Sequence, residues 1–465
     1  MAIKLLIGGS PCTHWSIAQK NNRETEPEGL GWELFKNYLI AKEKFKPDFF
    51  LYENNKSASQ AIKDQIATEL GVGVDPYARF TYINSALVSA QNRQRFYVTN
   101  FGDIEQPEDR GILLKDILEC GGFEHRMFSD NPNKQQVDMI AEPVYIGAVP
   151  ENNGTYLNGK QPSQQYRIYD TNGKGVAVTT AAITNVAEPV RVGCMPSPDG
   201  ELKNSQAKRI YSVDGKSVNL VANAGGEGAK TGLYAIPVNI TKDGKSQTIK
   251  AQYQQTSPLN ICKYTSTYGA SEVAEPVGCA TPIEWDENGV PTKATSCADG
   301  KVYTIYEAKD GVITIKGKQY PIKLKDGYYI IRKLTVTECC RLQTMPDDYC
   351  KAVSDSQAYK GLGNGWTAEV IIHLLNHALK DVPRDEEIIV LSLYDGIGTG
   401  RYCLDKMGFT NVKYYAYEID KYPIAISTDN YPDIVQCGDA FAVREDEWKA
   451  PQTRREWLDE LLGGE

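Results

Sequence analysis

Leu5-Leu6-Ile7-Gly8-Gly9-Ser10-Pro11-Cys12-Thr13-His14-Trp15-Ser16 lies close to the start of the chain and gives the first indication of the fold. Leu5-Leu6-Ile7 predicts a short buried strand, two glycines end the apolar run, and Pro11 stiffens the exit. Cys12 is therefore expected just past the carboxyl end of a strand, the edge of an open α/β sheet where ligands and reacting groups collect. An inert packing cysteine is the alternative, because free cysteines are among the most buried residues.

The chain has 465 residues, of which 41% are hydrophobic and 24% charged. That length predicts a large core divided into two or three domains. No apolar run approaches the roughly 18–20 residues that span a membrane, and the start lacks the pattern of a signal peptide, so a cytoplasmic protein is expected. The eleven cysteines form no CxxC pair, which favours a reducing compartment over a disulfide framework or a zinc ribbon.

The formal net charge of −9 argues against a protein that coats nucleic acid. Residues 143–331 nevertheless carry 20 basic and 17 acidic side chains, a net charge of +3, so the middle of the chain is where contact with a polyanion is expected. His373 and His377 lie four apart on a predicted helix, but no third ligand is near them in the sequence. A solvated helix face is expected there rather than a metal site.

Residues 1–101 alternate between strand and helix patterns, which is typical of an α/β fold. Helices are expected over 30–45 and 57–70, the second capped by Ser57, and strands over 49–52, 80–83 and 96–98. Glu53 follows one of these strands and falls on the edge that carries Cys12 if the strands are parallel. Arg93 and Arg95, two apart before another strand, are expected on one face, with a solvated basic strand end as the alternative.

From about residue 120 to 330 the pattern changes to short strands and turns, which indicates a separate β-rich domain. Ala-Glu-Pro-Val recurs at Ala141, Ala187 and Ala274, and each copy is followed by a strand containing Ile-Tyr and then by a turn. The turns are strong hairpin signals: Asn172-Gly173, Asp214-Gly215 and Asp310-Gly311. Three related hairpin units are therefore expected.

Residues 332–380 predict helices, one of them capped by Thr335 or Thr337, and residues 388–439 return to an α/β pattern. A strand over 388–393 leads into the glycine-rich turn Gly396-Ile397-Gly398-Thr399-Gly400 and a helix. Glu418 ends the next strand and Asp439 the one after it. A glycine turn at a helix N-terminus, followed by a carboxylate suited to a ribose, predicts an adenosine-containing cofactor; a structural turn with surface acids is the alternative.

Seven motifs together resemble those of the C5-cytosine DNA methyltransferases. They are Gly9-Ser10-Pro11-Cys12, Glu53-Asn54-Asn55, Gln91-Asn92-Arg93-Gln94-Arg95, Arg332-Lys333-Leu334-Thr335 with Glu338, Arg341-Leu342-Gln343 and Pro346-Asp347, Gly363-Asn364, and Asp395-Gly396 with Glu418 and Asp439. The resemblance covers essentially everything outside the β-rich middle. In that family the cofactor motifs come first, whereas here residues 388–439 close the chain, so the chain is similar to a circularly permuted member.

The resemblance implies an α/β fold, a doubly wound, Rossmann-like methyltransferase sheet in circularly permuted order, with a second, β-rich target-recognition domain. The implied boundaries are 1–118 and 332–465 for the two halves of the methyltransferase domain and 119–331 for the recognition domain. Ser392-Leu393-Tyr394-Asp395-Gly396 and Trp366 resemble the eukaryotic de novo subgroup. Ser392 departs from the acid often found at its position, and Asn55 departs from the usual valine.

The implied reaction moves a methyl group from S-adenosylmethionine to carbon 5 of a cytosine flipped out of double-stranded DNA, and leaves S-adenosylhomocysteine. Cys12 would add to carbon 6, Glu53 would be the acid at N3, Arg93 and Arg95 would hold the base carbonyl and the neighbouring backbone, and residues 13–28 would close over the base. The implied cofactor residues are Pro11, Asn364, Trp366, Tyr394, Gly396, Gly398, Thr399, Glu418, Ile419, Asp439 and Ala440.

Three alternatives stay open at this stage. The chain is either an active enzyme or an inactive DNA-binding protein on the same scaffold, and its target base is in DNA or in RNA. A restriction endonuclease is a candidate partner. The repeats in the β-rich domain provide an enlarged recognition surface, provide several alternative targets, or are a duplication without effect on specificity.

Overall fold

The computed structural model describes residues 2–11, 14–15, 23–119, 145–148, 167–169, 188–202, 208–220, 232–238, 283–296 and 298–445. Cys12, most of residues 13–28, the repeat copies at Ala141 and Ala274, and the Asn172-Gly173 turn lie outside these residues. The chain divides into two compact units, residues 1–123 with 187–465 and residues 124–186, and each is described by itself.

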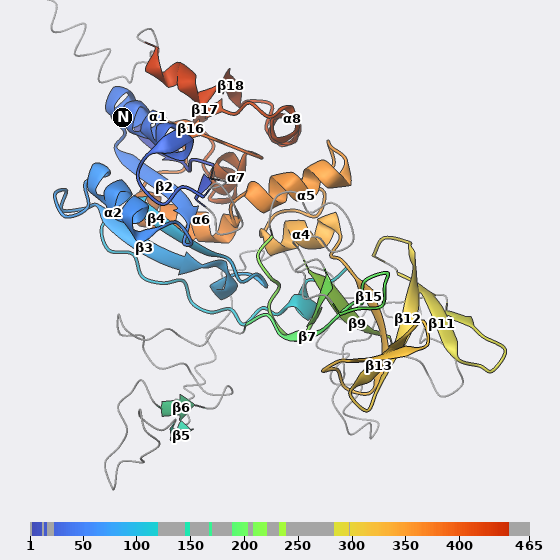
Figure 1. Cartoon of the computed structure of the whole chain (residues 1–465). Coiled ribbons are helices and arrows are strands. Elements are labelled where there is room, and N and C mark those ends of the chain that lie inside the picture. The colour runs from blue at the N-terminus through green and yellow to red at the C-terminus, as the bar shows by residue number, and fades with distance from the viewer. Residues whose placement is uncertain are drawn as a thin grey trace, which may run out of the picture. The chain divides into compact units, whose positions relative to one another are not determined.

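The first unit contains a seven-stranded sheet whose central strands come from opposite ends of the chain (Figure 1). In spatial order the strands are β18 (Val435–Gly438), β17 (Val412–Tyr417), β16 (Ile388–Leu393), β1 (Ile3–Gly8), β2 (Phe49–Asn55), β4 (Gln94–Thr99) and β3 (Arg79–Asn84). The strands from β18 to β2 are parallel, and β4 is antiparallel to β2 and β3. The predicted α/β sheet is confirmed.

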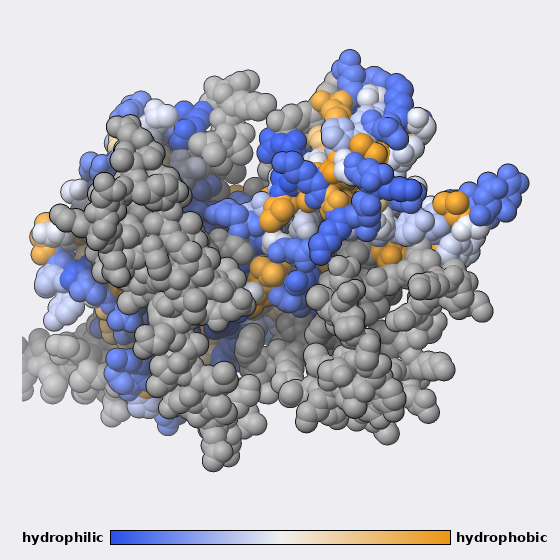
Figure 2. All heavy atoms as spheres, turned by 90° about the horizontal axis from the view of Figure 1, so that it is seen from below, coloured by the Kyte–Doolittle hydropathy of each residue, from blue (hydrophilic) through white to orange (hydrophobic). Residues whose placement is uncertain are grey.

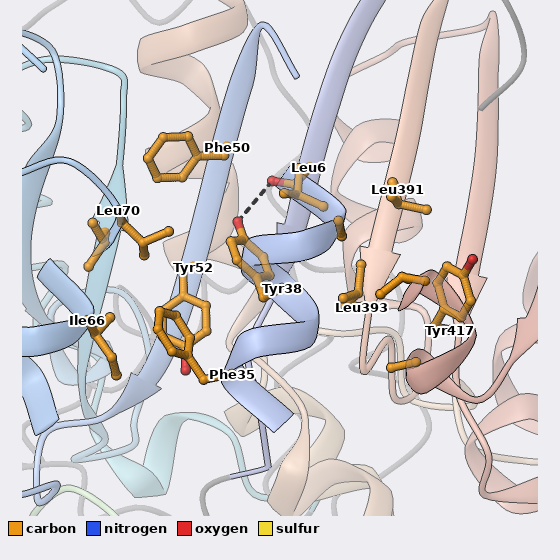
Figure 3. Packing of buried hydrophobic residues seen from close by; sticks show 14 of the residues in the cluster. Leu6, Phe35, Tyr38, Phe50, Tyr52, Ile66, Leu70, Leu391, Leu393 and Tyr417 are labelled. Carbon is orange, nitrogen blue, oxygen red and sulfur yellow. Dashed lines mark hydrogen bonds between the residues drawn. The ribbon is translucent and has the colours of Figure 1, made fainter. Parts of the chain in front are cut away.

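Helices cover both faces of this sheet. On one face, side chains such as Leu6, Phe50 and Leu391 pack with those of α1 (Gly29–Phe45) and α2 (Gln60–Glu69), as Figure 3 shows. On the other face, α7 (Thr399–Lys406) approaches so closely that a Cβ on Gly400 would lie 2.3 Å from Ile7 Cδ1. All six residues of β16 are buried, as expected for a parallel strand between two helical layers.

A second sheet of the first unit has nine strands and forms its β-rich part. The strands are β10 (Ile283–Trp285), β11 (Pro291–Thr295), β12 (Val302–Lys309), β15 (Gly327–Arg332), β9 (Leu233–Val238), β8 (Arg209–Ser212) and β7 (Arg191–Cys194) in spatial order. In addition, β13 (Val312–Ile315) pairs with β12, and β14 (Lys318–Pro321) pairs with β13. Side chains such as Ile210 and Ile313 form its core. The described surface is mostly hydrophilic in Figure 2, with hydrophobic residues in small groups.

The two predicted hairpin turns that the structure describes differ from each other. Asp310 and Gly311, with φ of 52° and 74°, join the antiparallel strands β12 and β13, which confirms that hairpin. The prediction for Asp214-Gly215 was wrong, because β8 pairs in parallel with the next strand, β9. The backbone after β8 bonds instead to a distant loop: Ser217 N donates to Ala90 O at 2.7 Å. These tertiary hydrogen bonds override the local hairpin preference.

The second unit contains a strand pair with the register of β7 and β8. There β5 (Tyr145–Ala148) and β6 (Arg167–Tyr169) are antiparallel. The matching pairs are Gly147 with Ile168 and Ala148 with Arg167 in one copy, and Gly193 with Ile210 and Cys194 with Arg209 in the other. An irregularity interrupts both ladders at the same place, so the described strand pairs that follow Ala141 and Ala187 have the same pairing pattern.

Residues 332–380 form three helices, α4 (Val336–Leu342), α5 (Asp355–Asn364) and α6 (Ala368–Leu379). Thr335 caps α4 in a capping box with Glu338. The glycine-containing run 361–364 favours a break between helices, but these residues form the end of α5. A Cβ on Gly361 would lie 2.8 Å from Ile397 Cγ2, so a glycine is needed here for close packing. The α2 cap is Ser59 rather than Ser57. A further helix, α8 (Lys421–Asn430), lies between β17 and β18 along the chain.

Candidate active site

The loop that leads to Cys12 is pinned against β2 at the carboxyl edge of the parallel strands. A Cβ on Gly9 would lie 2.4 Å from Glu53 O, so glycine is required for this close approach. Asn54 Nδ2 donates to Ser10 O at 2.9 Å, and Ser10 Oγ lies 2.8 Å from Tyr52 OH. No pattern in the sequence indicates this role of Tyr52. Pro11 is half-buried, and Cys12 lies outside the described residues.

Glu53 is buried, and both of its carboxylate oxygens have hydrogen-bond donors. Arg95 Nε lies 2.8 Å from Oε1, and Trp366 Nε1 donates to Oε2 at 3.0 Å. The sequence placed Glu53 after its strand, but β2 continues to Asn55, because residues 53–55 pair with β4 beyond the end of β1. The carboxylate is thereby fixed in orientation next to the Gly9 loop.

Arg93 and Arg95 are 3% and 7% exposed, which rules out the solvated strand end. Their guanidinium groups have different partners. Arg95 bonds to Glu53, whereas Arg93 donates to Asn219 Oδ1 at 2.9 Å and to Leu220 O at 3.1 Å. Arg93 also donates to the carbonyl oxygens of Gly363 and Gly365, the latter at 2.7 Å. The two arginines therefore do not act on the same groups.

A cavity of about 540 Å³ opens beside Arg95. Its walls are three segments: the end of β2 and the turn after it, the start of β4, and residues of the β-rich part. The lining residues are Asn55, Lys56, Ser57, Asn92, Gln94, Arg95, Pro189, Val218 and Asn219. Four amide side chains and two cationic side chains contribute to this wall, and they could bind a polar, anionic ligand.

The glycine-rich turn between β16 and α7 contains three residues in the left-handed region: Tyr394, Gly396 and Gly398, with φ of 59°, 61° and 78°. Glu418 at the end of β17 ties this turn down, because its Oε2 accepts from Gly396 N at 2.9 Å. Its Oε1 accepts from Ile419 N and Asp420 N, each at 2.9 Å. A carboxylate has about four lone-pair sites, so Glu418 retains capacity for hydroxyl donors of a ligand.

The structure brings most of the predicted cofactor residues to this end of the sheet. Ile419 is 72% exposed although it is apolar. Asp439 Oδ1 accepts from Phe441 N at the start of the short helix Ala440–Arg444. Thr399 is buried, and within the described residues its Oγ1 has no hydrogen-bond partner. Trp366 was also predicted here, but its indole N–H is used by Glu53, and Asn364 is exposed at the end of α5.

Asp395 belongs to one of the motifs but was not predicted as a site residue. Its carboxyl group points back toward the sheet. Ser392 Oγ and Tyr414 OH donate to its Oδ1 at 2.7 Å and 2.6 Å. Burial raises the pKa of the Asp395 carboxyl to about 6, although the hydrogen bonds from Tyr414 and Ser392 act in the opposite direction. A carboxyl group thus lies next to Ser392, the residue that stands where the family often has an acid. This departure at Ser392 was the single indication in the sequence of the contact between Ser392 and Asp395.

Within the described ranges, no group of three His, Cys, Asp or Glu side chains could hold a metal ion. His373 Nε2 lies 2.7 Å from Glu105 O, and His377 Nδ1 lies 3.0 Å from His373 O, so both rings bond to backbone. The same part of the chain has no helix that is long and apolar enough to cross a membrane.

Comparison with known proteins gives one family. A model described as C-5 cytosine-specific DNA methylase matches residues 1–380. The chain is 24% identical over 453 residues to the orphan methyltransferase M.Rho11sI of Bacillus phage rho11s, covering 82% of this chain and 86% of the relative. It is 25% identical over 396 residues to the orphan methyltransferase M.SPRI of Bacillus phage SPR, covering 79% and 80%. Among solved structures it is similar to the Entamoeba histolytica methyltransferase EhMeth, with 12% identity, a TM-score of 0.37, and coverage of 82% and 78%.

Proposed function

Because the chain belongs to the C-5 cytosine-specific DNA methylase family and is an S-adenosylmethionine-dependent DNA (cytosine-5)-methyltransferase, we propose that it methylates a flipped-out cytosine through a covalent bond to Cys12. One observation carries this proposal. Glu53 is a buried carboxylate, held by Arg95 and Trp366 beside the loop that leads to Cys12.

In the proposed reaction, the Cys12 thiolate forms a bond to carbon 6 of the base, and Glu53 protonates or hydrogen-bonds N3 to accept the displaced electron density. Carbon 5, now part of an enamine, takes the methyl group, whose bond to the donor sulfur breaks. Water then takes the proton from carbon 5, the electron pair of that bond forms the double bond between carbons 5 and 6, and the thiolate leaves; the N3 proton returns to Glu53, which restores the ring and the acid. S-adenosylmethionine supplies the electrophilic methyl group.

Arg95 and the cavity beside it support the placement of the target nucleotide. Arg95 bonds to Glu53 through its guanidinium and is one of the residues that line the cavity, so the same residue contacts the acid and the space open to a ligand. Lys56 adds a second cation to the same wall. We assign the base carbonyl to Arg95, and residues 13–28 to closing over the flipped base once it has entered.

The residues around the glycine-rich turn fit S-adenosylmethionine. The backbone at Gly396 and Gly398 adopts the left-handed conformation that glycine allows, and the N-terminus of α7 follows directly. Glu418 has acceptor capacity for the ribose hydroxyls, and the exposed side chain of Ile419 offers an apolar face for adenine. Pro11, Tyr394, Asp439 and Ala440 complete the proposed set.

We further propose that the chain is circularly permuted. The family match ends at residue 380, before the strands β16, β17 and β18 and the glycine-rich turn that they carry. Those strands nevertheless join the sheet of the N-terminal segment, with β16 directly beside β1. A parallel sheet depends on the packing of its strands and not on their order along the chain, which supports this rearrangement.

The substrate is DNA, and we assign its recognition to residues 119–331, the β-rich part, within which residues 143–331 carry a net charge of +3. Base edges in the major groove of double-stranded DNA are its proposed target.

Both phage relatives are called orphan methyltransferases, which supports an enzyme that works without a restriction endonuclease. We propose that it acts in the cytoplasm, in keeping with eleven cysteines that form no CxxC pair in the sequence.

Incubation of the full chain with radiolabelled S-adenosylmethionine and either DNA or RNA tests the function. We expect label only in DNA, at carbon 5 of cytosine, with positions given by sequencing of conversion-resistant cytosines. Label in RNA alone would assign the base to RNA. DNA binding with no transfer at any cofactor concentration would instead indicate an inactive binding protein.

A further inference from the structure

We propose that Arg93 is a positioning residue that couples DNA recognition to the acid Glu53 by way of Gly365 and Trp366. The recognition segment, defined here as residues 213–220, lies at one end of this connection, and the carboxylate of Glu53 lies at the other. The inference rests on the function proposed above, because it assigns to Glu53 the protonation of a base.

The recognition segment is bonded to the chain immediately before Arg93. Ser217 N donates to Ala90 O at 2.7 Å, and Asn92 N donates to Ser217 O at 2.9 Å, so the segment runs as a short parallel bridge beside Gln91. The buried ammonium of Lys216 donates to the carbonyl oxygens of Ala86 and Ser89. A shift of this segment therefore moves the backbone that carries Arg93.

The guanidinium of Arg93 then joins the recognition segment to the loop that carries Trp366. Nη1 donates to Asn219 Oδ1 at 2.9 Å and Leu220 O at 3.1 Å, and Nη2 donates to Gly365 O at 2.7 Å. Since the guanidinium is a rigid plane with several donors, it holds both sides in a fixed relation. A lysine ammonium has no such plane and cannot reproduce that relation.

The contact with Gly365 O reaches Glu53 through one peptide unit. Gly365 O belongs to the planar peptide that contains the nitrogen of Trp366, so a hydrogen bond to this oxygen sets the orientation of the next residue. Trp366 Nε1 then donates to Glu53 Oε2 at 3.0 Å. Gln343 Nε2 supports the same carbonyl at 3.3 Å. Orientation of the acid thus depends on Arg93.

The partners of Arg93 distinguish it from Arg95. Arg93 is 3% exposed and directs its guanidinium to backbone carbonyls and an amide oxygen, whereas Arg95 contacts the acid and lines the cavity. The residue pattern alone had assigned both arginines to the target nucleotide. We assign only Arg95 to it, and Arg93 to the alignment of Glu53 when the recognition segment is engaged.

The test uses the full chain with Arg93→Lys, Asn219→Ala, Trp366→Phe and the two double variants that combine Trp366→Phe with either of the others. The measured quantities are kcat at saturating DNA and S-adenosylmethionine, the Kd of each ligand, and the thermal unfolding midpoint. Arg110→Lys is the matched control, because Arg110 pairs with Glu369 outside this set of contacts.

We expect kcat to fall by about 10-fold or more in Arg93→Lys and Trp366→Phe, with both Kd values changed by less than about 3-fold. Each double variant should be no slower than its slower parent, because the residues act in series. If Arg93→Lys lowers the unfolding midpoint, the double variant of Asn219→Ala and Trp366→Phe is compared with its two single variants instead, because it tests the same series of contacts.

Two results would overturn the proposal: losses in kcat that multiply in the double variants, or a loss that appears as weaker DNA binding at unchanged kcat. The second result would place Arg93 on the DNA itself. Wild-type protein is measured in the same assay. If the wild type transfers no methyl group, the proposed function fails; if the wild type is active and the variants give either result above, only the role of Arg93 fails.

Discussion

Arg95 Nε lies 2.8 Å from Glu53 Oε1, and both side chains are buried. The pair connects β4 to β2 at the place where β2 extends past β1. A buried ion pair is costly to break from one side, at about 3–5 kcal/mol, because the remaining charge is left uncompensated. Variants at this site therefore need a stability measurement beside the activity measurement.

Cys12→Ser and Glu53→Gln should each lower methyl transfer by at least about 100-fold, because one removes the proposed nucleophile and the other the proposed acid. DNA binding should change little. Filter-bound radiolabel measures the transfer, and circular dichroism checks the fold of each variant. Glu387→Gln, at the opposite edge of the sheet, is the control. Transfer at the wild-type rate in either variant would exclude the proposed mechanism.

Lys216→Met should destabilise the protein by about 3 kcal/mol, because three carbonyl oxygens that accept from the buried ammonium lose their donor. The loss should be visible as a lower free energy of unfolding in urea. Lys115→Met, which removes an exposed ion pair with Asp214, should cost less than about 1 kcal/mol. Equal losses in the two variants would contradict the anchoring role of Lys216.

Ile419→Ala should raise the Kd of S-adenosylmethionine by about 10-fold, because the proposed apolar face for adenine is lost. Its unfolding midpoint should stay unchanged, since the side chain is 72% exposed in the protein. Isothermal titration calorimetry measures the affinity. Val435→Ala, another exposed apolar residue of the same half, should bind the cofactor as the wild type does. An unaltered Kd in Ile419→Ala would remove Ile419 from the site.

Asp395 should make stability depend on pH. Its pKa is raised by burial from near 3.8 to about 6, so between these values the folded protein binds more protons than the unfolded chain, and stability falls as pH rises. Asp395→Asn keeps an acceptor for Ser392 and Tyr414 but does not ionise. Relative to the wild type, its free energy of unfolding should therefore increase by up to about 3 kcal/mol from pH 4 to pH 7. Urea unfolding at both pH values measures this, and a constant difference would be inconsistent with it.

Replacement of residues 124–186 by a flexible linker should leave the other unit folded, because they form a compact unit of their own. Sequencing of methylated sites then separates the interpretations of the repeat. Loss of one class of sites with retention of another would indicate alternative targets, and an unchanged site list would indicate a duplication without effect. A general loss of affinity at unchanged sites would indicate one enlarged surface.

The strand and helix patterns of the two α/β segments were readable because they are local. The buried run of β16 begins and ends where its pattern predicted, and the glycine-rich turn follows it as expected. Thr335 caps its helix for the same reason, since the capping residue and its partner Glu338 are three residues apart. Neighbouring residues are sufficient to specify such features.

The candidate site was only partly readable. The motifs predicted that Glu53 and Arg95 belong to one site. Trp366 was assigned to the cofactor, whereas its indole N–H bonds to Glu53, which lies 313 positions away in the chain. Asp395 was named in a motif, but its contact with Tyr414 was not predicted, because Tyr414 belongs to another strand. No local pattern encodes which distant donor reaches a buried acceptor.

The α/β class and the motifs could be read from the sequence alone, because periodicity and short motifs act over a few residues; the roles of the residues in those motifs stay predictions. Two features depend on the tertiary structure. Asp214-Gly215 does not form a hairpin turn, because β8 pairs in parallel with β9. Arg93 bonds to Asn219 and Gly365 and does not share the partners of Arg95. A buried donor must be satisfied by whatever acceptor the packing places next to it, and packing is a property of the whole fold.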